Sequence, residues 1–162
     1  MNSLCMKVLA ATMAILLTAC GEGHTVVNST PVPGIKAQTA SIGYEEGTVK
    51  PPEATVAKMK QFLEQRFFQG KAPKFTPGSE LVIKWGFIGH DAGSQFTRWF
   101  IGFGAGSAKT VVRAEFFDAA GNKVGSIQAD GSVSGGFFGG SGDEALKQVA
   151  EQIAKYAEAN FR

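Results

Sequence analysis

The sequence predicts an α+β fold: a small antiparallel sheet with two helices packed on one of its faces. Apolar residues at three- and four-residue steps predict amphipathic helices over residues 53–69 and 142–159. Alternating apolar residues and turn signals predict strands over residues 81–87, 109–117 and 123–133. With one earlier strand the element order is β-α-β-β-β-α, and both helices can then cover one face of the sheet.

The first strand is predicted over residues 36–44. Ala40, Ile42 and Tyr44 alternate there, although Gly43 interrupts the pattern. This segment contains few large apolar residues, which leaves the number of strands in the sheet open.

The first helix begins after Pro51 and Pro52, because proline is pre-organised for a first helical turn and lacks only an N–H that has no partner there. Gly70 ends it. Its apolar stripe consists of Val56, Met59, Leu63 and Phe67.

The central strands show the clearest period of two. Asp118, Gly121 and Asn122 provide turn chemistry between the last two of them and predict a β-hairpin. The residues predicted to share one face are Leu81, Ile83, Trp85 and Phe87 in one strand and Val112, Ala114 and Phe116 in the next.

The second helix has a capping box at its start, since Ser141 lies three residues before Glu144. Its apolar stripe consists of Leu146, Val149, Ile153, Tyr156 and Ala157. Core packing is the predicted role of both helical stripes.

The N-terminus carries a membrane-targeting signal. A run of apolar residues, 8–17, follows Lys7 and is too short to span a bilayer. The sequence Leu-Thr-Ala-Cys that ends at Cys20 resembles the bacterial lipobox. The resemblance implies cleavage before Cys20 and acylation of it with palmitate-type chains, and Gly21 then favours the outer membrane. A plain secretory signal is the alternative.

This signal divides the chain into three parts. Residues 1–19 are the predicted lipoprotein signal peptide, and residues 20–34 form a flexible tether rich in small and polar residues. Residues 35–162 form one α+β domain, long enough to bury a core of its own.

Composition excludes several classes of protein. The net charge of +2 offers no basic field for nucleic acid. The two cysteines, Cys5 and Cys20, fall in the signal and at the lipid site, so no disulfide, zinc site or thiol nucleophile is expected in the domain. The 21 glycines are about twice the usual share.

Glycine and phenylalanine gather in two stretches. One begins near Arg98 and includes Gly104-Ala105-Gly106-Ser107-Ala108, and the other is Gly135-Gly136-Phe137-Phe138-Gly139-Gly140. These stretches, the strand ending at Phe117 and the closing helix resemble the bacterial domain-of-unknown-function family 4410. The resemblance covers roughly residues 36–160 and implies a lipoprotein-like location and fold without an assigned activity.

The two stretches are also the candidate interaction surface. Side by side, they would form an exposed patch for a partner protein or the bilayer, whereas bent backbone under aromatic side chains is the structural alternative. The first stretch does not fit a phosphate-binding loop, because a strand follows it instead of a helix N-terminus. The candidate patch consists of Arg98, Trp99, Phe100, Phe103, Phe137 and Phe138.

No catalytic constellation, metal set or cofactor motif is evident in the sequence. We therefore expect a membrane-anchored periplasmic lipoprotein with a non-catalytic binding or assembly role in the cell envelope. It would be held by acyl chains on Cys20, with a protein partner or copies of itself. The alternatives are a hydrolase that uses His90 and Asp91 in a predicted loop over residues 89–94, and a self-associating membrane-active protein.

Overall fold

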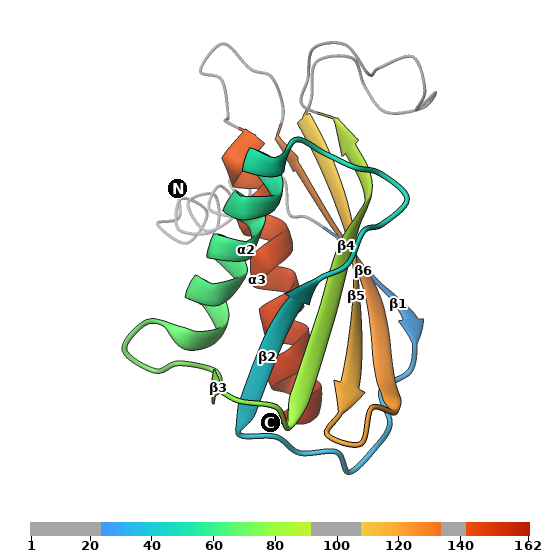
Figure 1. The fold of residues 1–162 in the computed structure, drawn as a ribbon, viewed down its shortest axis with the longest axis vertical. Coiled ribbons are helices and arrows are strands. Elements are labelled where there is room, and N and C mark those ends of the chain that lie inside the picture. Colours follow the sequence, from blue (N-terminus) through green and yellow to red (C-terminus); the bar gives the residue numbers. More distant parts are fainter. Residues whose placement is uncertain (1–23, 92–107, 134–141) are drawn as a thin grey trace, which may run out of the picture.

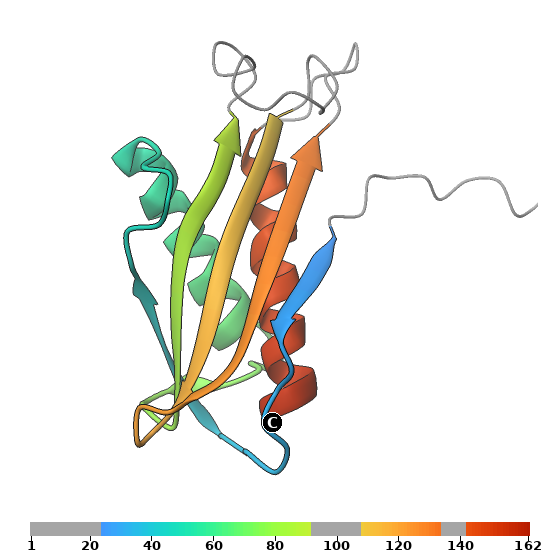
Figure 2. The same ribbon diagram turned by 90° about the vertical axis from the view of Figure 1, so that its right-hand side faces the viewer.

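A six-stranded sheet carries two helices on one face (Figures 1 and 2), which confirms the predicted α+β class. The computed structural model describes residues 24–91, 108–133 and 142–162. The strand order is β1-β6-β5-β4-β2-β3. The elements are β1 (Thr25–Ser29), β2 (Thr39–Tyr44), α2 (Glu53–Phe68), β3 (Thr76–Pro77), β4 (Leu81–Asp91), β5 (Ala108–Asp118), β6 (Lys123–Val133) and α3 (Gly142–Phe161).

The predicted hairpin joins β5 and β6. Asp118 accepts hydrogen bonds at one carboxylate oxygen from the backbone N–H of Ala120 at 3.0 Å and of Asn122 at 2.8 Å. Gly121 has a φ of 84°, in the left-handed region that glycine tolerates best. The hydrogen bond from the Asn122 side chain, together with those from the backbone, holds the pKa of Asp118 below its usual value.

The face of the sheet beneath the helices is apolar. Alternation along each strand sends every second side chain toward the helices, where it is removed from water. The buried residues on this face include Leu81, Ile83, Trp85 and Phe87 of β4, Val112, Ala114 and Phe116 of β5, and Ile127 and Ala129 of β6.

Both predicted helical stripes face this core. Met59, Leu63 and Phe67 of α2 are buried, and Val56 packs against them at partial exposure. In α3, four of the five predicted stripe residues are buried and Tyr156 packs against the core at its edge. Burial raises the pKa of the Tyr156 hydroxyl.

The opposite face of the sheet, here called the open face, carries charged side chains among partly exposed apolar ones. Glu115 pairs with Lys123 of the neighbouring strand, and Lys84 pairs with Glu45 at 2.7 Å. The ammonium group of Lys84 also lies 5.1 Å from the centre of the Phe117 ring. This alternation of apolar and charged side chains agrees with the period of two in the sequence.

The sheet is mixed rather than purely antiparallel. β2 runs parallel to β4, with register pairs from Ala40–Leu81 to Tyr44–Trp85, and β3 runs parallel to β2. The reason is that α2 carries the chain back along the sheet, so that the strand after it starts from the same end as β2. Periodicity in the sequence carries no information about strand direction.

β1 forms within the segment that was predicted to be a tether. It pairs antiparallel with β6 from Thr25–Ala129 to Ser29–Ser126, and all five of its residues are exposed. Because its side chains are exposed on both faces, it shows no alternation of apolar and polar residues. β-branched residues and a free edge of the sheet are sufficient for it to pair through its backbone.

Neither of the two helices described, α2 or α3, is long and apolar enough to cross a bilayer.

Candidate functional site

Four element ends gather at one end of the sheet, here called the open end (Figures 1 and 2). β4 finishes there at Asp91, β5 begins at Ala108, β6 finishes at Val133 and α3 begins at Gly142. The register places Ala108 opposite Val133 and Asp91 opposite Lys109. Both glycine- and phenylalanine-rich stretches therefore leave and rejoin the domain at the same end.

The predicted site residues themselves belong to segments 1–23, 92–107 and 134–141. Those segments lie outside the described residues. The structure describes the residues to which these segments are joined. The residues concerned are Cys20, Arg98, Trp99, Phe100, Phe103, Phe137 and Phe138.

α3 and β6 pack closely against each other near the open end. A Cβ atom built on Gly131 would lie 2.1 Å from the backbone oxygen of Ala145, so only glycine permits this contact. The side-chain oxygen of Gln148 accepts a hydrogen bond from the N–H of Ser132 at 3.2 Å, and the side-chain amide of Gln152 donates to the oxygen of Asp130 at 2.8 Å. The start of α3 is thus held directly on the end of β6.

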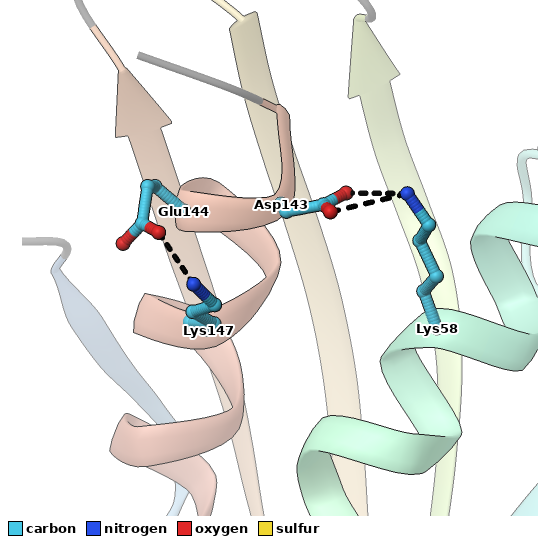
Figure 3. Close-up of polar contacts among 4 residues, drawn as sticks. All are labelled: Lys58, Asp143, Glu144 and Lys147. Carbon is cyan, nitrogen blue, oxygen red and sulfur yellow. Dashed lines mark hydrogen bonds and ion pairs between the residues drawn. The ribbon is translucent and has the colours of Figure 1, made fainter.

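Charges at the start of α3 are paired (Figure 3). Lys58 of α2 donates to both carboxylate oxygens of Asp143, at 2.9 and 3.1 Å, and Lys147 pairs with Glu144 one turn along the helix. Two acidic residues in the first turn also suit the positive end of the helix dipole. The Lys58–Asp143 contact connects the two helices beside the open end, and ion pairs together with the helix dipole account for both carboxylates.

The chain enters the domain near the same end. The N–H of His24 donates to the Asp130 carboxylate at 3.1 Å, and the N–H of Asp130 donates to the His24 oxygen at 2.9 Å. The Thr25 hydroxyl donates to the side-chain oxygen of Gln152 at 2.7 Å. Lys109 also lies 3.9 Å from Asp130. The first described residues are therefore fixed to both β6 and α3.

His90 and Asp91 lie in β4 and not in a loop, which corrects the prediction for these two residues. They pair with Thr110 and Lys109 of β5. The register between β4 and β5 shifts between Phe87 and Gly89, and β4 continues beyond this irregularity to Asp91.

Metal-ligating residues do not cluster in the parts of the chain that the structure describes. No group of three or more His, Cys, Asp or Glu residues comes together within residues 24–91, 108–133 and 142–162.

The exposed apolar side chains at the two edges of the sheet were not predicted from the sequence. Among the described residues, the large apolar side chains that are exposed are Val26, Val27, Val32 and Tyr44. The first three lie in β1 or just after it, and Tyr44 ends β2. The signal for β1 was available, because residues 24–33 contain no Asp, Glu, Lys or Arg and include adjacent β-branched residues.

Comparison with protein families gives one assignment. The model of a family described as "Domain of unknown function (DUF4410)" matches residues 56–136, half of the chain. The matched range contains α2 and the central strands β4, β5 and β6. No curated protein matches the chain.

Comparison with solved structures identifies a similar fold. A dodecamer of a PelC variant from Paraburkholderia phytofirmans has a TM-score of 0.52 at 13% identity, covering 86% of this chain and 98% of that one. A second PelC dodecamer from the same organism has a TM-score of 0.48 at 14% identity, covering 86% and 99%. At such low identity the first likeness shows a shared fold.

Proposed function

This chain belongs to the family described as "Domain of unknown function (DUF4410)", and on that basis we propose that it is a lipid-anchored protein of the bacterial cell envelope. It assembles with copies of itself and has a binding or assembly role rather than a catalytic one. The observation that carries the proposal is that the N-terminal segment and both glycine- and phenylalanine-rich stretches attach to the domain at or near its open end.

The anchor in this proposal is Cys20, acylated as the lipobox resemblance implies. β1 begins at Thr25, so the five residues before it extend at most about 17 Å. Thr25 pairs with Ala129, four residues before the end of β6, a distance of about 13 Å along the strand. β1 runs antiparallel to β6, so Thr25 is the end of β1 that lies nearer the open end. Cys20 is therefore able to reach the level of the open end.

The open end then faces the membrane, the outer membrane in this proposal, from its periplasmic side. A short connection leaves the domain little freedom to stand away from the bilayer. The segments that carry the candidate patch join the domain at this end, and we propose that the aromatic side chains of the patch bind either the bilayer interface or a neighbouring protein. The patch consists of Arg98, Trp99, Phe100, Phe103, Phe137 and Phe138.

Self-association is supported by the fold. PelC, which shares it, is a dodecamer, and we extend homo-oligomerisation to this chain without fixing the number of copies. Anchoring many copies in one membrane also raises their effective concentration, which favours assembly.

The test begins with the native N-terminus. Mass spectrometry of protein purified from bacterial membranes is expected to show a mature chain that starts at an acylated Cys20. Cys20→Ala is expected to abolish the acyl mass, whereas Cys5→Ala, the matched control within the signal, leaves it unchanged. An unmodified thiol at Cys20, or a chain that starts elsewhere, would overturn the proposed anchor.

The same acyl-free Cys20→Ala protein tests the patch. We expect it to retain weak binding to lipid vesicles that falls when Trp99 and Phe137 are also changed to Ala. Unchanged vesicle binding assigns the patch to a protein partner instead of the bilayer.

A further inference from the structure

Exposed apolar side chains mark the two opposite edges of the sheet. Val26 and Val27 of β1 are 54% and 52% exposed, and Tyr44 at the end of β2 is 37% exposed. Edge strands normally carry charges or proline that prevent pairing with another chain, but β1 contains neither. At the other edge, β3 covers β2 only at Thr39 and Ala40.

Backbone groups on both edges point outward. His24 exchanges hydrogen bonds with Asp130 of β6, so alternation turns the N–H and C=O of Thr25 and Val27 away from the sheet. At the other edge the backbone oxygen of Ala40 accepts a hydrogen bond from the N–H of Gly78, on the side of β2 that faces away from β4. The same alternation turns the backbone groups of Ile42 and Tyr44 outward.

The two edges lie at the same level, and their strands run in opposite directions. Register pairs form one row across the sheet, which runs Val27–Ile127–Ala114–Trp85–Tyr44. Val27 and Tyr44 therefore lie at the same height on opposite edges. β2 runs parallel to β4 and β1 runs opposite to it, so the two edge strands run in opposite directions.

We infer that the β1 edge of one copy packs against the β2 edge of the next copy, head to tail, with Val27 beside Tyr44 of its neighbour. This inference rests on the proposed self-assembly and names the surface that carries it. Copies related by rotation about an axis along the strands would pair these edges antiparallel. A closed ring has no rise along its axis, so its two contact surfaces must lie at one height, and this row satisfies that condition.

A second copy is the occupant that fits both edges at once. An unrelated strand could occupy either edge alone, but it would not account for matched levels on opposite sides of one molecule. Two β1 strands meeting each other would leave the Tyr44 edge unused and would stop at a dimer.

The experiment uses full-length protein extracted in detergent, with its mass measured by native mass spectrometry or analytical ultracentrifugation. Val27→Asp and Tyr44→Asp are each expected to convert the oligomer to monomer. Ala120→Asp, at the exposed hairpin turn away from both edges, is the control that keeps the wild-type mass. Circular dichroism spectra that match the wild type show that each variant still folds.

Mixing the two edge variants provides the sharper result. Val27→Asp keeps an intact β2 edge and Tyr44→Asp keeps an intact β1 edge, so an equimolar mixture is expected to form a dimer of one copy each. If Tyr44→Asp alone forms dimers, β1 meets β1 and the head-to-tail contact is wrong. If both variants keep the wild-type oligomer, the inference fails while self-assembly stands. A monomeric wild type overturns both.

Discussion

The two faces of the sheet share the same strands but have opposite roles. The face beneath α2 and α3 is apolar and buried, so it provides most of the stability. The open face carries ion pairs such as Glu115 with Lys123, and a lysine over Phe117. Exposed contacts of this kind contribute little to stability. We therefore expect residues next to each other in one strand to differ several-fold in their contribution to the free energy of unfolding.

The largest effect on the free energy of unfolding is expected at Phe116, with the adjacent Phe117 as its comparison. Phe116 is fully buried against Phe161 and Tyr156, and Phe117 lies partly exposed on the open face. Phe116→Ala is expected to lower the free energy of unfolding by about 3–5 kcal/mol, because it removes a large side chain and leaves a cavity. Phe117→Ala is expected to cost about 1 kcal/mol. Urea unfolding measures both, and equal losses would contradict the division between the faces.

A smaller effect on the free energy of unfolding is expected at Gly131, with Gly43 as its comparison. Gly131 touches the backbone of α3, whereas a Cβ built on Gly43 meets no atom within 4 Å. Gly131→Ala is expected to cost about 1–3 kcal/mol, because the helix must move from the sheet to admit one methyl group. Gly43→Ala is expected to leave stability within about 0.5 kcal/mol of the wild type. Thermal unfolding compares the two, and a harmless Gly131→Ala would show that α3 is not held against β6.

The smallest effect on the free energy of unfolding is expected from a change to Glu115 on the open face. Glu115 lies beside Lys123 and Arg113 on a partly exposed surface. Glu115→Gln is expected to cost at most about 1 kcal/mol, and the difference from the wild type should shrink as salt is raised. Unfolding at low and high salt provides the measurement. A large loss that is independent of salt would indicate that this pair has a structural role like that of the core.

The elements that bury one clear stripe were predictable from the sequence. Trp85 and Phe116 reach the core because the period of two along their strands matches a sheet with one covered face. Met59 and Leu63 do the same at helical spacing. The hairpin was predictable because Asp118 and Asn122 form its hydrogen bonds within five residues of chain.

The remaining features depend on contacts between distant residues. β1 buries no side chain, so only its register with Ala129 and its neighbours identifies it as a strand. The parallel direction of β2 follows from the path of α2, and the extension of β4 through His90 follows from pairing with Thr110. The Cys20 anchor and the aromatic patch remain predictions, whereas the open end could be recognised only from the arrangement of strand and helix ends.

The pairing of β1 with β6 has a mechanical consequence. Any pull on the chain ahead of His24 is transmitted first to β1, whose bonds to β6 cross the direction of the strand. A pull along the strand loads these bonds together in shear, whereas a pull across the sheet opens them one after another. A domain suspended from its N-terminus therefore resists detachment most strongly when the force runs along its strands.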